Sequence, residues 1–197
     1  MRIKKEVRNI VIIISGMAGT GKSTLAKRIA ERYFLNYFSG GDALKQLAME
    51  KGYEPKGNGW WESEEGLKFL EERERDKRFD GKVDDKLIKM ANRGNVVLDS
   101  WTMPWLFKGE AFKIWLKASL EVRAERAAKR DLMKAENIKK IIKEKDERTR
   151  LIYKNLYGFD FGVDLSPFDL ILNTDKFNSD EVYDVVSKAV DLYIKIK

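Results

Sequence analysis

The first clear pattern along the chain is a run of five aliphatic residues, Ile10 to Ile14, with no polar position among them. A run that is apolar at every position indicates a strand covered on both faces, as in the middle of a parallel sheet. From Lys22 the spacing changes, because Leu25, Ile29 and Tyr33 recur every four residues and indicate one face of a helix. This part of the chain is therefore expected to form a strand, a glycine-rich turn and a helix.

Short apolar runs and amphipathic segments continue to alternate along the rest of the chain. Four further strands are predicted, at Tyr37–Ser39, Val96–Asp99, Phe112–Lys117 and Asp169–Asn173. Helices are predicted at Ala43–Met49, Ser63–Lys77, Val83–Ala91, Ser119–Lys129 and Glu136–Tyr157, with a last one that starts near Asn178 or Ser179. Strands separated by helices are typical of an α/β fold with a parallel sheet. Because no repeat, linker or low-complexity tract interrupts the pattern, we expect a single domain over residues 1–197.

Composition narrows the chemistry that such a fold can carry. The 197 residues include no Cys and no His, which excludes disulfides, Ser-His-Asp triads and zinc sites built on thiolate or imidazole. Most of the net charge of +7 comes from residues 120–154, which hold twelve basic and seven acidic side chains. Residues 62–85 instead hold ten acidic and six basic side chains. The two segments are therefore expected to contact different groups.

Hydropathy predicts a protein outside the membrane. The basic N-terminal residues precede only five consecutive aliphatics, too few for the apolar stretch of a signal peptide. No later run approaches the roughly 18 apolar residues that a membrane helix requires. We expect a cytoplasmic protein without a membrane partner, and take a monomer as the default.

One motif indicates the chemistry. Residues 16–23 fit the pattern GxxxxGK[ST] of a phosphate-binding P-loop and lie between the first strand and the first helix, where such a loop must lie. Glycines let the backbone turn its N–H groups toward phosphates, which a Cβ would obstruct. Lys22 is expected to reach the β- and γ-phosphates and the Ser23 hydroxyl to bind Mg²⁺; an ordinary glycine-rich turn is the alternative. The predicted ATP-binding residues are Gly16, Met17, Ala18, Gly19, Thr20, Gly21, Lys22, Ser23 and Thr24.

Further segments with recognisable residue patterns occur over nearly the whole chain. They are Leu25–Lys27, Tyr37–Asp42, Gly94–Asp99, Lys113–Arg126, Leu156–Asp160 and Phe168–Thr174. Together with the P-loop, they make the chain similar to the cytidylate kinase family of P-loop nucleoside monophosphate kinases, and most of all to its short archaeal members. The resemblance implies a P-loop fold with a five-stranded parallel sheet flanked by helices. It also implies an acceptor-binding helical insertion at residues 41–94 and a basic helical lid at residues 119–155.

The resemblance implies roles for five cationic side chains as well. Arg123 and Arg126 match lid arginines of the family, and Arg148 and Arg150 fall in its second basic cluster. With Lys22 they are the predicted catalytic residues, which would stabilise the charge on a phosphoryl group in transfer. The alternative for each arginine is an exposed helix face with ordinary ion pairs.

On the acceptor side the residues leave more alternatives open. Asp99 ends an apolar strand, where it could hold magnesium together with Ser23, meet the acceptor, or cap the next segment. Asp42 either orients the acceptor or caps a helix that begins at Ala43. The predicted acceptor-binding residues are Ser39, Asp42, Lys45, Asp99 and Trp101, and the predicted metal-binding residues are Ser23 and Asp99.

The acceptor side also departs from the family. Lys45 and Trp101 stand where the family has arginines, and a lysine offers a point charge in place of a bidentate fork. In an ungapped alignment, Lys145, Thr149 and Ile152 stand where the family has an arginine, an acid and an arginine that recognise cytosine and phosphate. These changes suggest a kinase that keeps its donor half while its acceptor has drifted.

The tryptophans Trp60, Trp61, Trp101 and Trp105 lie near the same predicted edge, where they either stack on a base or fill the core. The leading expectation is ATP- and Mg²⁺-dependent phosphorylation of a nucleoside monophosphate, with CMP or dCMP as the first candidates. A P-loop kinase of another nucleotide or small metabolite is one alternative. A nucleotide-dependent, RNA-associated protein is another, although acids interleave the basic residues and nucleic acid is not the expected partner.

Overall fold

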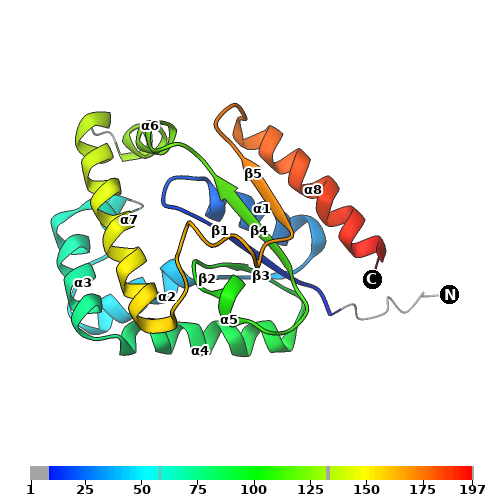
Figure 1. Ribbon diagram of the computed structural model, residues 1–197, viewed down its shortest axis with the longest axis horizontal. Coiled ribbons are helices and arrows are strands. Elements are labelled where there is room, and N and C mark those ends of the chain that lie inside the picture. The colour runs from blue at the N-terminus through cyan, green and yellow to red at the C-terminus, as the bar shows by residue number, and fades with distance from the viewer. Residues whose placement is uncertain (1–8, 58, 132–133, 197) are drawn as a thin grey trace.

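The computed structural model describes residues 9–57, 59–131 and 134–196 (Figure 1). Within these ranges five strands form one parallel sheet, in the order β2-β3-β1-β4-β5. The strands are β1 (Val11–Gly16), β2 (Asn36–Ser39), β3 (Val96–Asp99), β4 (Phe112–Lys117) and β5 (Leu170–Asn173). The predicted α/β fold with a five-stranded parallel sheet is confirmed, and every predicted strand is present to within two residues.

The register of the central strands decides where the loops after them meet. Ile14 of β1 pairs with Asp99 of β3, and Asp99 in turn pairs with Ser39 of β2. On the other side of β1, Gly16 pairs with Leu116 of β4. Because parallel strands end at the same edge, the turns that follow β1, β2 and β3 lie side by side. Ligands of open α/β sheets bind at this carboxyl edge.

Two layers of helices explain why the first apolar run has no polar position. Ile12 and Ile14 of β1 pack under α1 (Lys22–Tyr33) and α8 (Ser179–Ile196). Val11 and Ile13 face the opposite layer, with α2 (Gly40–Glu50), α4 (Arg78–Arg93) and the short helix α5 (Met103–Leu106). Alternate side chains therefore enter two separate cores, and each must be apolar.

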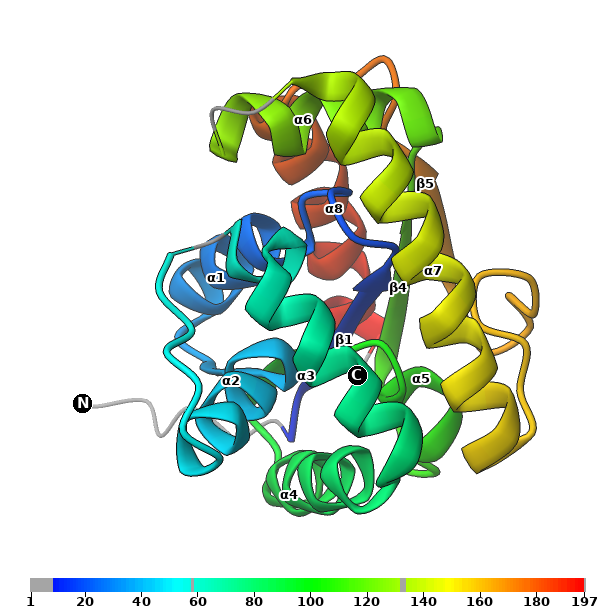
Figure 2. The same ribbon diagram turned by 90° about the vertical axis from the view of Figure 1, so that its left-hand side faces the viewer.

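Two helical segments rise from this core. The segment between β2 and β3 contains α2, a 3₁₀ turn η1 (Gly59–Glu62), α3 (Glu64–Arg75) and α4, and it corresponds to the predicted insertion. After β4, the predicted lid segment contains α6 (Leu120–Asp131) and α7 (Ala135–Tyr157). Alanines of α6 pack against Ile138 and Ile142 of α7. Figure 2 shows α3 alongside α7, with α6 across one end of α7.

The structure differs from the predicted helix boundaries by more than two residues in two places. Helix α2 begins at Gly40 and not at Ala43, because the Ser39 Oγ caps it by accepting a hydrogen bond from the Asp42 N–H at 3.1 Å. The capping role considered for Asp42 is therefore wrong, since Asp42 lies within the first turn. Helix α4 begins at Arg78, five residues before the predicted start, and accommodates Gly81. The four-residue helices η1 and α5 were not predicted.

Two glycines of the insertion provide a test of its packing. An added Cβ at Gly66 of α3 would lie 2.1 Å from the Trp60 carbonyl oxygen, whereas at Gly81 of α4 no described atom lies within 4 Å. Gly66→Ala is expected to lower the free energy of unfolding by about 1–3 kcal/mol, because the 3₁₀ turn must move away. Gly81→Ala is expected to raise it by up to about 1 kcal/mol through helix propensity. Urea unfolding measures both; equal stabilities would contradict the close approach of η1 to α3.

Candidate functional site

The turn between β1 and α1 has the tight backbone that its glycines predict. Gly16 has a φ of 150°, and a Cβ there would lie 2.3 Å from the Leu116 carbonyl oxygen of β4. Gly19 has a φ of 82°, and its Cβ would lie 2.9 Å from the Arg123 carbonyl oxygen of α6. The turn is thus held between the sheet and the first lid helix. It ends at Gly21, the N-cap of α1, so the positive end of that helix lies beside the turn.

A cleft of about 460 Å³ opens in front of this turn. Its walls come from the turn, the carboxyl ends of β2 and β3, the insertion, and both lid helices. Of the residues predicted to bind ATP, those that line the cleft are Ala18, Gly19, Gly21, Lys22, Ser23 and Thr24. The Thr20 hydroxyl instead donates a hydrogen bond to the Met17 carbonyl oxygen at 2.9 Å, and this bond stabilises the turn.

Lys22, Ser23 and Asp99 form the floor of the cleft. The Ser23 hydroxyl donates to Asp99 Oδ2 at 2.5 Å, and the Tyr37 hydroxyl donates to the same oxygen at 3.4 Å. Burial raises the pKa of Asp99, while the charge of Lys22 and the Ser23 hydrogen bond oppose that shift. Lys22 donates from Nζ to the Met17 carbonyl oxygen at 3.2 Å. Burial lowers the pKa of this ammonium, and the charge of Asp99 is the largest opposing effect.

The Ser23 and Asp99 side chains are suited to bind a magnesium ion, both by the type of their donor atoms and by their position. Both offer hard oxygen atoms, and they lie beside the turn that is expected to hold phosphates. Among the described residues no group of three or more acidic, His or Cys side chains is close enough to hold a metal alone. Magnesium commonly binds through one or two protein oxygens plus phosphates and water, so this small donor set is sufficient.

The two lid arginines predicted from α6 both lie near the turn. Arg123 is buried and donates to the Ala18 carbonyl oxygen at 3.2 Å and to Asp146 Oδ2 of α7 at 2.7 Å. Its Nε is also buried and has no hydrogen-bond partner among the described residues. Arg126 lines the cleft and donates to the Thr174 hydroxyl and carbonyl at 2.9 and 2.7 Å. Both guanidinium groups therefore lie where phosphate oxygens could replace their present partners.

The second predicted arginine pair lies elsewhere. Arg148 of α7 pairs with Glu74 of α3 through two hydrogen bonds of 2.6 and 2.8 Å, which connect the two helices. Arg150 pairs with Asp160 and its side chain is 45% exposed. Neither is among the residues that line the cleft. In this arrangement the two side chains form ion pairs on helix faces, the alternative considered for them, and a catalytic role would require α7 to reorient.

All five predicted acceptor-binding residues line the cleft: Ser39, Asp42, Lys45, Asp99 and Trp101. Lys45 donates from Nζ to the Gly57 carbonyl oxygen at 2.8 Å, and burial lowers the pKa of its ammonium. The Lys22 ammonium lies 5.5 Å from the centre of the Trp101 ring. The arginine that the family has at position 101 is thus replaced by an aromatic face beside the P-loop lysine.

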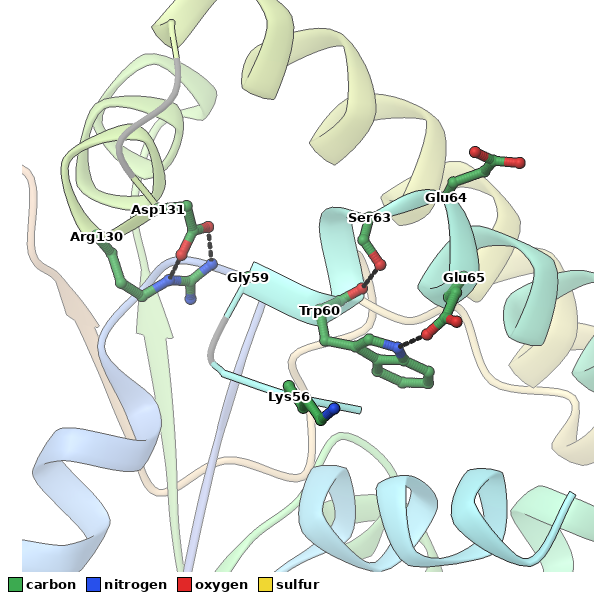
Figure 3. Close-up of a pocket in the computed structure, with 8 residues that line it drawn as sticks. All are labelled: Lys56, Gly59, Trp60, Ser63, Glu64, Glu65, Arg130 and Asp131. Carbon is green, nitrogen blue, oxygen red and sulfur yellow. Dashed lines mark hydrogen bonds and ion pairs between the residues drawn. The ribbon is translucent and has the colours of Figure 1, made fainter. Parts of the chain in front are cut away.

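The four tryptophans divide between the two predicted roles. Trp61 and Trp101 line the cleft, whereas Trp105 stacks on Phe159 with ring centres 4.3 Å apart. Trp60 is 4% exposed and donates from Nε1 to Glu65 at 3.2 Å. Figure 3 shows this contact in a separate hollow between η1 and the end of α6. Packing is therefore the main role of Trp60 and Trp105, and only the other two can meet a ligand in the cleft.

A buried ion pair that sequence reasoning missed lies at the far end of the cleft. Arg73 of α3 donates from Nε and Nη2 to the two oxygens of Asp80 of α4, at 3.1 and 2.7 Å, and both side chains are 3% exposed or less. The Tyr153 hydroxyl lies 3.4 Å from the same guanidinium. The position of Arg73 in the sequence could have indicated this pair, because Arg73 follows Phe69 and Leu70 on the apolar face of its helix. A charged residue on a buried stripe indicates a paired group.

Asp84 is a second buried carboxyl in this wall. It accepts hydrogen bonds from the Thr102 hydroxyl at 2.5 Å and from the Tyr157 hydroxyl of α7. Burial raises the pKa of Asp84 to about 6, although both hydrogen bonds oppose the shift. In the sequence it lies one turn after Asp80 on the buried stripe of α4.

The three positions that the resemblance matches to cytosine- and phosphate-binding groups of the family are all buried in α7. Lys145 lines the cleft and binds Glu62 of the insertion. Ile152 packs with Tyr153 in an aromatic core, and Thr149 is 2% exposed. Only the first of the three therefore presents a cation to the cleft.

Comparison with known proteins agrees with this geometry. A sequence model of the cytidylate kinase-like family matches residues 11–176. Cytidylate kinase from Pyrococcus horikoshii is 40% identical over 182 residues, covering 92% of this chain and 88% of the relative. The enzyme of the same name from Methanocaldococcus jannaschii is 36% identical over 188 residues, covering 92% and 98%. A shikimate kinase from Acinetobacter baumannii, solved with shikimate, is 17% identical with a TM-score of 0.57 and 96% coverage of both chains.

The sheet order, the glycine-rich turn and the solved relative define the fold of P-loop kinases. The match over residues 11–176 is more specific, and the chain belongs to the cytidylate kinase-like family.

The raised pKa of Asp84 predicts how stability depends on pH. In the unfolded chain an Asp titrates near 4, so the folded state holds the proton more tightly between pH 4 and 6. The stabilising contribution of Asp84 is fully present below about pH 4 and is lost as pH rises through 6. The stability of the wild type relative to Asp84→Asn should therefore fall by about 2 kcal/mol from pH 4 to 7. Urea unfolding at a series of pH values measures this difference; a flat difference would mean that Asp84 titrates normally.

Proposed function

We propose that the protein transfers the γ-phosphoryl group of ATP to a nucleoside monophosphate, with CMP and dCMP as acceptors. The observation that carries the proposal is one cleft whose lining includes both the P-loop turn with Lys22 and the polar wall around Arg73 and Asp84. Trp101 and residues of α6 and α7 line the same cleft. Such a cleft can hold two phosphate-bearing ligands end to end, as phosphoryl transfer requires. The curated relatives at 36–40% identity are cytidylate kinases, which supports the same acceptor.

On the donor side, the backbone N–H groups of the turn and the N-terminus of α1 bind the β- and γ-phosphates. Lys22 exchanges its bond to the Met17 carbonyl for phosphate oxygens, and its lowered pKa reflects a desolvated site in which its charge acts strongly. Ser23 and Asp99 would hold Mg²⁺, which supplies charge neutralisation of the phosphates. Arg123 and Arg126 then stabilise the charge on the equatorial oxygens of the group in transfer.

The reaction itself needs little from a side chain acting as a base. A phosphate oxygen of the acceptor attacks the γ-phosphorus, the bond from that phosphorus to the β-phosphate oxygen breaks, and ADP leaves. The acceptor phosphate is already largely ionised at pH 7, so no proton has to be removed first. Asp99 is therefore free to serve the metal, and its position against Ser23 suits that role. The protein contributes alignment of the two phosphates and exclusion of water.

The far wall of the cleft suits a base with an exocyclic amine. Cytosine presents an N4 amine that carboxylates recognise, and Asp80 and Asp84 offer carboxylate oxygens there. Arg73 and the Tyr153 hydroxyl offer donors to the ring nitrogen and carbonyl of the same base. Trp61 and Trp101 offer aromatic faces at the sides of the cleft. Uracil carries a carbonyl where cytosine carries the amine, and fits this wall less well.

The charge distribution supports a nucleotide partner over RNA. Basic residues of the lid segment are largely engaged with acids, as in the pairs Arg123–Asp146, Arg130–Glu62 and Lys139–Glu121. RNA binding instead requires cations that face solvent and release counterions. None of the described helices has both the length and the apolarity needed to cross a bilayer.

A panel of acceptors tests the proposal. In a coupled assay with ATP and Mg²⁺, kcat/KM for CMP and dCMP should exceed that for UMP, AMP and GMP by at least about 100-fold, as sites that hydrogen-bond a specific group achieve. Shikimate and gluconate represent hydroxyl acceptors on the same fold and should show no turnover. Faster turnover of a hydroxyl acceptor, or equal turnover of UMP, would overturn the assignment.

The role of Lys22 can be tested in the same assay. Lys22→Ala should lower kcat for CMP phosphorylation by about 10²–10³-fold, the usual loss for a preorganised group that stabilises developing charge. Lys68→Ala is the matched control, because Lys68 is 60% exposed and pairs with Glu64 within α3. That variant should keep wild-type kcat. Full activity of Lys22→Ala would show that the P-loop lysine does not contact the transferred group.

A further inference from the structure

Glu62 occupies an unusual place between the insertion and the lid. It is the last residue of η1 and is 7% exposed. One carboxylate oxygen accepts a hydrogen bond from Nζ of Lys145 in α7, and the other accepts from Nη2 of Arg130 at the end of α6, at 3.1 Å. All three side chains line the cleft. A single carboxylate thus links the insertion to both helices of the lid.

Three cationic side chains lie near the Glu62 carboxylate, and together they could bind an anion with more oxygen atoms than a carboxylate has. Lys45 lies close enough that the charges of Glu62 and Arg130 both influence the pKa of its ammonium, which burial lowers. Lys145 in turn is near enough to Lys22 to lower the pKa of the P-loop lysine. Arg130 and Lys145 therefore contact one carboxylate, and Lys45 lies within reach of its charge in the same cleft as the P-loop. Three cations that line one cleft suit the oxygens of a phosphate dianion.

Stability alone does not account for this cluster. A buried ion pair costs desolvation that its attraction barely repays, and apolar residues in its place are often neutral or stabilising. Lys145 shows the cost, since burial lowers the pKa of its ammonium while Glu62 opposes the shift. Arg130 is oriented independently of Glu62, because Asp131 accepts from its Nε at 2.7 Å and from Nη2 at 2.5 Å (Figure 3). The guanidinium would therefore remain in position if Glu62 moved away.

We propose that Glu62 is an internal substitute for the phosphate of the acceptor: it occupies Arg130 and Lys145 in the empty protein, and the acceptor phosphate displaces it. This inference rests on the proposed function, since it assumes a nucleoside monophosphate acceptor. Arg130 then supplies the bidentate fork that Lys45 does not offer. Glu62 acts as a positioning residue. It pairs with Lys145 and with Arg130 until a dianion of higher charge replaces it.

Removing the charge of Glu62 should strengthen acceptor binding. In Glu62→Gln the acceptor phosphate no longer competes with the Glu62 carboxylate for Lys145 and Arg130, so KM for CMP should fall about tenfold, within the range typical of such couplings, while kcat changes less than about twofold. The matched control is Glu74→Gln, because Glu74 also bridges the insertion to α7, through Arg148, but lies outside the cleft. That variant should leave KM for CMP at the wild-type value.

Two further measurements separate the outcomes. Calorimetric titration with CMP in the absence of ATP should give a lower Kd for Glu62→Gln than for the wild type, and a Kd raised at least about tenfold for Arg130→Met. An unchanged or raised Kd in a folded Glu62→Gln variant, or an unchanged Kd in Arg130→Met, would overturn the inference. If Glu62→Gln does not fold, the titration of Arg130→Met still tests the inference, because an unchanged Kd in that variant overturns it. If CMP binds as expected but is not phosphorylated by the wild type, the proposed function fails and this inference stands.

Discussion

The structure depends on one electrostatic constraint: the cations gathered around the cleft must find hydrogen-bond acceptors within the protein when the cleft is empty. Each of these cations has such an acceptor. Lys22 uses the carbonyl of Met17, Arg123 uses the carbonyl of Ala18 together with Asp146, and Arg126 uses Thr174. These partners satisfy the donors, which would otherwise lose several kilocalories each on burial. They are also exchangeable, because phosphate oxygens make stronger charge-assisted bonds to the same groups. The cleft is thus ordered in advance without being closed to its ligands.

The parallel sheet brings these groups together from distant parts of the chain. The pairing of Ile14 with Asp99 places the strand-end carboxylate beside the start of the P-loop, where the Ser23 hydroxyl meets it. The pairing of Ser39 with Asp99 places the first turn of α2 at the same edge. Both depend on the apolar β1 strand, whose alternate side chains enter the two cores. A shift of one residue in this register would exchange the two faces and separate Asp99 from the turn.

Much of the fold could be predicted because strands and P-loop have local signatures, whereas much of the site could not. The aliphatic run before Gly16 identifies a central strand by itself, but four-residue helices such as Met103–Leu106 show no period to detect. The roles of charged residues are harder still to predict in a chain in which 36% of the residues are charged. Residue type alone does not distinguish the roles of Arg73 and Arg148. One is buried against Asp80 and the other pairs with Glu74 outside the cleft. The packing of α7 against its neighbours decides this difference, and no local pattern records it.

The contacts along α7 change in kind from one end of the helix to the other, which bears on which of them a ligand can release. Near its C-terminal end, Ile152 and Tyr153 pack with Leu70 of α3 in an aromatic core. Further toward its N-terminus the contacts with the insertion are ionic, through Arg148 and then Lys145. Apolar contacts have no competitor in a nucleotide, whereas ionic contacts exchange readily with phosphate. The C-terminal, aromatic end of α7 is therefore expected to stay in place, whereas a ligand can release the ionic contacts nearer its N-terminus. The Glu62 contact lies at that releasable end and within the cleft, so of these contacts it is the one that an arriving phosphate meets.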